Sequence, residues 1–221
     1  MRTVFSTNHE SSHLTSDNER ECFMTDELLV IKDITERLDK ALIHYMITGS
    51  IALSFYTTPR FTRDIDVVIE VSFSEWQKIV ELFEKDYYIS VEAVKDATER
   101  RSIFNIIHNE TVIKVDFIVK KIDEYRQVEF SRKIKKKING FDAWLVSKED
   151  LILSKLVWAK ESESEIQLTD VKSLLVSGQN EFDYLESWAK KLSVSDLLLK
   201  VNQSSSTAES LTSLLRKGST K

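Results

Sequence analysis

The stretch from Tyr45 to Val71, YMITGSIALSFYTTPRFTRDIDVVIEV, decides the fold of this 221-residue chain. Its first apolar residues predict a short strand that stops at Gly49, and residues 51–55 predict a buried helix directly after it. Beyond a break at Pro59, the segment from Asp64 to Val71 is rich in β-branched residues and predicts a second strand. The stretch therefore predicts a strand, a turn, a helix and a strand, in an α/β fold.

Two carboxylates begin the second strand. Side chains two residues apart on a strand point to the same side, so Asp64 and Asp66 are expected to share one face. With their charges ~6 Å apart and an effective dielectric constant of about 20, the repulsion is on the order of 3 kcal/mol. A positive group should therefore lie beside them. Either Arg60 and Arg63 supply that charge, or a divalent cation with a preference for carboxylate oxygens does so.

The Gly49-Ser50 pair has two interpretations. Glycine lets the backbone come close to a ligand, and the N–H groups and dipole of the helix that Ser50 opens could hold a phosphate. A simple strand-to-helix turn with Ser50 as the N-cap explains the dipeptide on its own. The spacing to Asp64 favours the phosphate interpretation.

A further acidic residue lies on a later strand. Alternation over residues 112–119 places the apolar side chains on one face and Lys114 and Asp116 on the other. Asp116 could be an edge residue held in an ion pair. It could equally supply the third carboxylate that a second metal or a general base requires.

The rest of the chain up to residue 146 mixes helical and strand patterns. The expected elements are a helix from Asp26 with an apolar stripe ending at Leu42, a helix over residues 76–83 capped by Ser74, a charged connection over residues 95–101, a hairpin over residues 103–119 turning at Asn109-Glu110, and a strand pair turning at Asn139-Gly140.

From Ser147 onwards the pattern is helical. A capping signal at Ser147 is followed by apolar periods that predict helices over residues 148–160, 164–177, 181–192 and 195–201. We therefore expect a flexible arm over residues 1–25, a catalytic α/β domain over 26–146, a helical domain over 147–203 and a polar tail with a weak helix over 204–221.

Composition restricts the class of protein. The chain is 42% hydrophobic and 30% charged, which is ordinary for a globular protein. Cys22 is the only cysteine, so neither an intramolecular disulfide nor a cysteine-based metal cluster can form. Because the sequence has no long apolar run and no signal-peptide pattern, we expect a soluble cytoplasmic protein with no membrane contact.

The formal net charge of -5 gives no general attraction to nucleic acid, so such a contact would have to be local. The densest basic run is Arg132-Lys133 followed by Lys135-Lys136-Lys137. It could be a solvated edge. It could instead guide the phosphates of an RNA acceptor toward the acidic residues.

Taken together, three segments resemble the polymerase-beta-like nucleotidyltransferase superfamily: Gly49-Ser50, the run Arg60-Phe61-Thr62-Arg63-Asp64-Ile65-Asp66, and Lys114-Val115-Asp116-Phe117. The Arg-Xaa-Thr-Xaa-Asp-Ile-Asp form of the second segment, together with Glu149-Asp150-Leu151-Ile152 and Lys155, resembles the abortive-infection toxin branch, whose members are typically encoded with an antitoxin. The resemblance covers residues 26–178. It implies a nucleotidyltransferase fold with a mixed, mainly antiparallel sheet flanked by helices, plus a C-terminal helical domain.

The resemblance also implies roles for individual residues. Gly49 and Ser50 would contact nucleotide phosphates, with Arg60 and Arg63 offsetting phosphate charge. Asp64, Asp66 and Asp116 would hold Mg²⁺, with Mn²⁺ as the alternative ion. Lys155 and Asp170 match a helical lysine and a later aspartate that complete the site in the toxin branch. From the residues alone, Lys155 could instead extend from its helix to water, and Asp170 could interact along its own helix.

The expected activity is Mg²⁺-dependent transfer of a nucleotide from a nucleoside triphosphate such as ATP to an acceptor hydroxyl. The first hypothesis for the acceptor is RNA, especially a tRNA end, in a toxin–antitoxin or phage-defence system with a cognate antitoxin. The alternatives are transfer to a protein or to a small molecule such as an antibiotic, a non-catalytic nucleotide-binding module of the antitoxin type, and a purely structural interaction protein.

Overall fold

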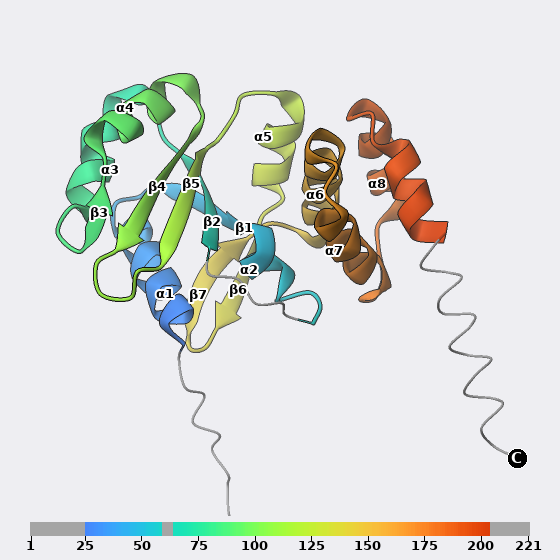
Figure 1. The fold of residues 1–221 in the computed structure, drawn as a ribbon, viewed down its shortest axis with the longest axis horizontal. Coiled ribbons are helices and arrows are strands. Elements are labelled where there is room, and N and C mark those ends of the chain that lie inside the picture. Colours follow the sequence, from blue (N-terminus) through green and yellow to red (C-terminus); the bar gives the residue numbers. More distant parts are fainter. Residues whose placement is uncertain (1–24, 59–63, 204–221) are drawn as a thin grey trace, which may run out of the picture.

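The computed structural model describes residues 25–58 and 64–203 (Figure 1). Arg60 and Arg63 lie outside the described residues, as do residues 1–24 of the predicted arm and the whole predicted tail.

The chain folds into a mixed α/β structure. The strands are β1 (His44–Thr48), β2 (Asp64–Glu70), β3 (Tyr87–Ile89), β4 (Ile103–His108), β5 (Lys114–Val119), β6 (Ile134–Ile138) and β7 (Phe141–Leu145). The helices are α1 (Asp26–Lys40), α2 (Gly49–Leu53), the 3-10 turn η1 (Phe73–Glu75), α3 (Trp76–Phe83), α4 (Val91–Arg100), α5 (Glu124–Ser131), α6 (Lys148–Ser162), α7 (Glu165–Val176) and α8 (Phe182–Lys191), with a further helical stretch over residues 195–203.

The strands form one sheet in the order β3-β4-β5-β2-β1-β7-β6. Within the described part of the chain, β2 pairs with β5 and β1 pairs with β7 in parallel, while the other four neighbouring pairs are antiparallel. The predicted mixed, mainly antiparallel sheet is therefore confirmed, as are the helices that follow residue 147. Figure 1 shows α6, α7 and α8 gathered at one side of the molecule, beyond α2 and α5.

Two clusters of buried apolar side chains hold these layers together. The first joins the sheet to α1, α3 and α4. The second contains the inward side chains of α6, α7 and α8, and it also includes Met46 of β1, Leu53 of α2 and Phe130 of α5. The C-terminal helices therefore share their core with elements that precede residue 147.

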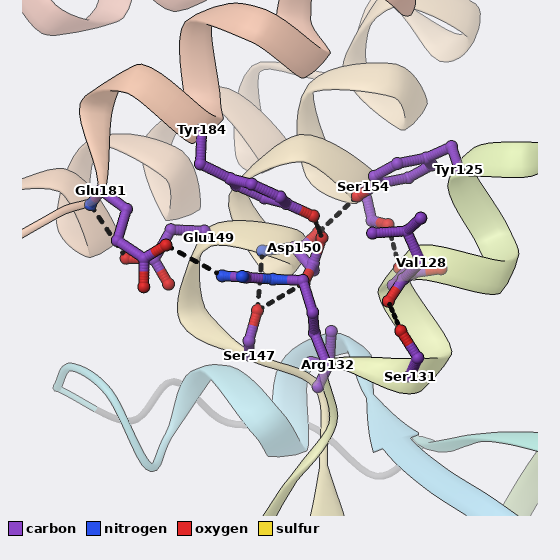
Figure 2. A network of polar contacts seen from close by, with 12 residues as sticks. Tyr125, Val128, Ser131, Arg132, Ser147, Glu149, Asp150, Ser154, Glu181 and Tyr184 are labelled. Atoms are coloured by element: carbon purple, nitrogen blue, oxygen red, sulfur yellow. Dashed lines mark hydrogen bonds and ion pairs between the residues drawn. The ribbon is translucent and has the colours of Figure 1, made fainter.

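A polar network around Asp150, at the start of α6, also holds the C-terminal helices in place (Figure 2). The Asp150 carboxylate has no exposed surface and accepts hydrogen bonds from the Ser147 hydroxyl at 2.6 Å, the Tyr184 hydroxyl at 2.6 Å and Arg132 Nε at 3.1 Å. The Arg132 guanidinium lies 3.9 Å from the centre of the Tyr184 ring and also pairs with Glu181 at 3.2 Å. The network links the end of α5 to α6 and α8.

Several local expectations hold. Ser147 caps α6, because its side chain accepts from the Asp150 N–H. Asn139 and Gly140 have φ values of 40° and 90°, the left-handed backbone that a tight hairpin turn requires. The β4–β5 hairpin also turns at residues 109–111 as predicted. Among the described residues, no helix combines the length and apolar character needed to cross a bilayer.

Two predicted helix boundaries were wrong. The apolar stripe of α1 does not reach Leu42, which has a φ of 56° and is 87% exposed, because the helix ends at Lys40 and Ile43 takes the buried position. Ser74 does not cap the following helix. The N-cap of α3 is Glu75, whereas Ser72 caps the preceding 3-10 turn η1, in a capping box with Glu75.

Two helices were not predicted. Residues 91–100 form α4 rather than a charged connection, because Ser90 caps them and Val94 and Ala97 are buried while the charged residues face outward. α5 also lacks a strong sequence pattern, although Asp123 caps it and Tyr125 is buried against the C-terminal helices. Both helices depend on burying a few apolar side chains rather than on a long stripe.

Candidate functional site

Two neighbouring strands bring the three predicted carboxylates to one face of the sheet. β2 and β5 run parallel with Asp66 opposite Asp116 and Asp64 opposite Lys114. Residues directly opposite each other on adjacent strands point to the same side, and burial alternates along both strands with the apolar residues inside. Asp64, Asp66 and Asp116 therefore form an acidic trio at the start of two strands, as the alternation predicted.

The Asp66 carboxyl has a raised pKa. This pKa is raised to about 6, mainly by burial and then by the charges of Asp116 and Asp64, whereas Lys155 and Lys114 oppose the increase. The site thus holds a surplus of negative charge that the protein's own cations only partly offset.

Gly49 lies directly against Asp66. A Cβ atom added to Gly49 would stand 1.9 Å from Asp66 Oδ2, and the glycine has a φ of +64°. No other residue can occupy this position without a shift of the carboxylate and backbone strain. Ser50 is largely buried within α2 and is not its N-cap, which is Thr48, so the simple capping interpretation of Ser50 was wrong.

One positive group beside the carboxylates, among the residues that the structure describes, is Lys114, from the same strand as Asp116. Its Nζ lies 2.9 Å from Asp116 Oδ2 and 3.7 Å from Asp64 Oδ1. The hydrogen bond to Asp116 raises the pKa of Lys114 above its ordinary value, so this group remains an ammonium at neutral pH. The alternation along β5 predicted that Lys114 lies on the same face as Asp116, and this pattern could have identified Lys114 as a cation beside the carboxylates.

Lys155 and Asp170 form a buried ion pair between α6 and α7. Lys155 Nζ donates to Asp170 Oδ2 at 2.7 Å and to Gln167 Oε1 at 3.0 Å, with the Lys155 and Asp170 side chains only 4% and 6% exposed. The alternative in which Lys155 extends to water was wrong. Its charge instead acts on Asp66, whose pKa it lowers. The helical lysine is thus close enough to the acidic trio to influence it electrostatically.

The basic run does not form one cationic surface. Alternate residues of β6 point to opposite faces, and most members of the run have partners within the protein. Arg132 pairs with Asp150 and Glu181, Lys133 lies over the Phe130 ring, Lys135 pairs with Asp142, and Lys136 lies over the Tyr56 ring, while Lys137 is exposed. The run therefore gives little support to a continuous path for RNA phosphates.

Over residues 25–58 and 64–203, no three histidine, cysteine, aspartate or glutamate side chains are grouped so that they could hold a metal ion. In the acidic trio, Asp64 and Asp116 both approach the Lys114 ammonium instead.

No protein-family model and no curated protein matches the chain. Solved structures do match it. An antigenic nucleotidyltransferase-like protein from Paracoccidioides brasiliensis superposes with a TM-score of 0.58 at 19% identity, over 85% of this chain and 92% of that one. ANT(2")-Ia in complex with adenylyl-2"-tobramycin superposes with a TM-score of 0.51 at 14% identity, over 76% of this chain and 98% of that one.

The chain has a nucleotidyltransferase fold. This agrees with the resemblance that the Gly49-Ser50 turn and the acidic residues carry. At identities this low the likeness concerns the fold, so any role for a residue must be argued from the geometry of the acidic trio and its neighbours.

Proposed function

We propose that this chain is a metal-dependent nucleotidyltransferase that transfers a nucleoside monophosphate from a nucleoside triphosphate to an acceptor hydroxyl. The observation that carries the proposal is the register of β2 and β5, which sets Asp66 beside Asp116 on the face that also presents Asp64. Gly49 adds support, because the backbone at the start of α2 lies directly against the Asp66 carboxylate.

The donor set suits Mg²⁺, or Mn²⁺ in its place. Burial and two neighbouring carboxylates raise the pKa of Asp66, which means that the folded protein disfavours a further negative charge at this site. A hard divalent cation would neutralise the charge of these carboxylates. Asp64, Asp66 and Asp116 would hold the ion once their side chains turn toward it, because in the structure Asp64 and Asp116 approach the Lys114 ammonium and the three are not grouped as metal ligands. When bound, it would supply Lewis-acid stabilisation of the phosphate oxygens.

The side chains around the trio have separate tasks in the proposed reaction. The acceptor oxygen bonds to the α-phosphorus, the bond from that phosphorus to the bridging oxygen breaks, and pyrophosphate leaves. The Asp116 carboxylate accepts the proton of the acceptor hydroxyl. Gly49 lets the Asp66 carboxylate pack against the start of α2, and Lys155, oriented by Asp170, adds positive charge on the side of α6.

For the acceptor, the surface beside Asp116 favours a small hydroxylated molecule. Asn105 of β4 lies directly opposite Asp116, and the other β4 side chains on that face, Ile103 and Ile107, are also uncharged. Ile103 is 60% exposed, so this face of β4 is open to a ligand. The adenylyl-2"-tobramycin in the ANT(2")-Ia complex supports the idea that this fold can serve a small acceptor.

RNA is the second candidate acceptor, in a toxin with a cognate antitoxin. One observation favours it. Lys155 and Asp170, the two positions that the toxin-branch resemblance implies, contact each other at 2.7 Å near the acidic trio. The dispersed contacts of the basic run weigh against it.

A transfer assay separates these candidates. The protein is incubated with each α-³²P-labelled nucleoside triphosphate, Mg²⁺, and one of three acceptor pools: total RNA, a protein extract, or a panel of aminoglycosides, lincosamides and other hydroxylated small molecules. We expect label on a small molecule and release of pyrophosphate. Label on RNA alone would instead establish the second candidate.

The matched variants are Asp66→Asn, which removes a partly buried carboxylate, and Asp142→Asn, which removes an exposed carboxylate paired with Lys135. Transfer should fall by at least about a thousandfold in the first variant and stay unchanged in the second. Equal transfer by Asp66→Asn and the unmodified protein would exclude the trio as the reaction centre. No transfer to any pool, with nucleotide binding indifferent to Mg²⁺, would indicate a non-catalytic module.

A further inference from the structure

Lys114 is placed unusually for a lysine near a proposed metal site. It begins β5, two residues before Asp116, and its ammonium contacts two members of the acidic trio, at 2.9 Å from Asp116 Oδ2 and 3.7 Å from Asp64 Oδ1. A single protein cation therefore bridges a carboxylate of β5 and a carboxylate of β2.

The contact of Lys114 with Asp116 and Asp64 reduces the repulsion among the three carboxylates. Three carboxylates on one face repel one another, and they do so more strongly where water is partly excluded. Before any ligand binds, the ammonium of Lys114 offsets part of this repulsion at Asp116 and Asp64, and the charges of Lys155 and Lys114 both act on Asp66. The Lys114 ammonium does so at the oxygens that a divalent cation would need.

The position of Lys114 also allows its ammonium to move away from Asp116 and Asp64. Its side chain is 39% exposed, and four methylene groups connect the ammonium to the backbone, so the charged end can move by several bond rotations while β5 stays fixed. A nucleoside triphosphate brings new anionic oxygens to the same face of the sheet.

We propose that Lys114 is a tethered counter-cation that exchanges partners: its ammonium neutralises Asp116 and Asp64 until a divalent cation displaces it, and it then binds a phosphate oxygen of the nucleotide. This inference rests on the proposed function, and it assigns a separate task to a residue outside the trio. Lys114 acts on the substrate only after exchange, so the same charge opposes metal binding and favours triphosphate binding.

Because the two effects are opposite, removing Lys114 should change the affinities for metal and for triphosphate in opposite directions. Without the lysine, metal ions alone should bind more tightly, because they no longer compete with an ammonium. With the metal sites saturated, a triphosphate should bind more weakly, because one charged hydrogen bond is lost. A residue with a merely structural role would shift both affinities in the same direction.

The experiment compares the unmodified protein with Lys114→Met and Lys114→Arg by isothermal titration calorimetry. Mn²⁺ alone is the first probe, and inorganic tripolyphosphate at saturating Mg²⁺ is the second, which avoids any choice of base. We expect Lys114→Met to lower the Kd for Mn²⁺ roughly tenfold and to raise the Kd for tripolyphosphate roughly tenfold. Lys114→Arg, which keeps the charge, should stay closer to the unmodified protein in both.

Lys120→Met is the matched control, because Lys120 directly follows β5 and pairs with Glu70 at the far end of β2. It removes the same net charge and should leave both Kd values within about twofold. Melting temperatures of all variants verify that they fold.

Two failures can be told apart. If the unmodified protein binds no Mn²⁺, or binds it equally well after Asp66→Asn, the proposed function and this inference both fail. If Mn²⁺ binding depends on Asp66 but Lys114→Met changes neither affinity, or shifts both in the same direction, the exchange alone is overturned.

Discussion

At the scale of single residues, Asp66 and Gly49 show how a candidate reaction site lowers the stability of the folded chain. The backbone at Gly49 approaches Asp66 Oδ2 so closely that a Cβ atom would stand 1.9 Å away. The carboxylate is thereby kept from water and beside two others, which raises its pKa to about 6. Such a charge is unfavourable in the folded chain by itself and becomes favourable only when a cation binds.

Asp66→Asn should therefore stabilise the metal-free protein at neutral pH. Below pH 3.8 the carboxyl is protonated in both the folded and the unfolded state and has no effect, whereas above about pH 6 it is ionised in both, and the folded state bears the penalty. The gain from Asp66→Asn should rise from about zero at pH 4 to the order of 2–3 kcal/mol at pH 7.5. Urea unfolding with EDTA at both pH values measures it.

Asp142→Asn serves as the control for this pH dependence. Its carboxylate is 54% exposed and is paired with Lys135, so the substitution should change stability by less than about 0.5 kcal/mol at either pH. If Asp66→Asn destabilised the protein equally at pH 4 and pH 7.5, the buried charge would not be the source of the penalty.

Gly49→Ala tests the close approach itself. The new methyl group would collide with the Asp66 carboxylate, and the left-handed backbone would add strain, so we expect a loss of roughly 2–4 kcal/mol in the free energy of unfolding. Gly178→Ala is a matched control, since Gly178 also has a positive φ, of +122°, but no atom lies within 4 Å of the added Cβ. Its loss should be smaller by at least about 1 kcal/mol. Equal losses would show that strain alone requires the glycine.

At the scale of elements, local signals in the sequence predicted those helices and strands whose ends or periods are strong. Ser147 gave the start of α6, and Asn139-Gly140 gave the β6–β7 turn, because a cap and a left-handed turn need only neighbouring residues. α4 was missed because only a few of its side chains are buried, and its charged residues hide that pattern. The pairing of Lys155 with Asp170 was also missed, since it depends on how α6 packs on α7.

The Lys155–Asp170 pair should show strong coupling between its two members. Lys155→Met deprives a carboxylate that is 6% exposed of its ammonium partner, which should cost roughly 3–5 kcal/mol. Adding Asp170→Leu removes that buried charge as well, so the double variant should recover at least half of the loss. Chemical unfolding of both single variants and the double variant gives the coupling energy. Additive losses would contradict a direct pair.

Nucleotidyl transfer should remain low in the double variant even though its stability recovers. That difference separates a site role of the pair from a purely structural one. Recovery of transfer together with stability would limit Lys155 to holding α6 on α7.

At the scale of the whole molecule, the sequence predicted the class of fold but not the contacts that join its parts. The strand order places β5 beside β2 although 43 residues lie between Glu70 and Lys114, and no local pattern reports such a pairing. Arg132 is a clear case. Within the sequence it belongs to a basic run, but in the fold it pairs with Asp150 and covers Tyr184, residues that come later in the chain (Figure 2). Charge read along a sequence therefore overstated the cationic surface.

The predicted boundary between a catalytic domain and a helical domain at residue 147 leads to a final prediction, about cooperativity. The core of α6 to α8 includes Met46, Leu53 and Phe130, so the helices cannot unfold without exposing apolar surface of β1, α2 and α5. We expect one calorimetric transition for the full chain. Asp150→Ala should lower that single transition, by roughly 3–5 kcal/mol in stability, because it removes the acceptor for Ser147, Tyr184 and Arg132.

Glu186→Ala on the exposed side of α8 is the control and should leave the transition temperature nearly unchanged. Two resolved transitions in the unmodified protein would mean that the helices form an independent domain despite the shared core. A second transition that appears only in Asp150→Ala would mean that the Asp150 network, rather than the apolar cluster, couples the two parts. A single transition in both proteins would instead make α6 and the acidic trio parts of one cooperative unit, so that Lys155 is held near Asp66 whenever the sheet is folded.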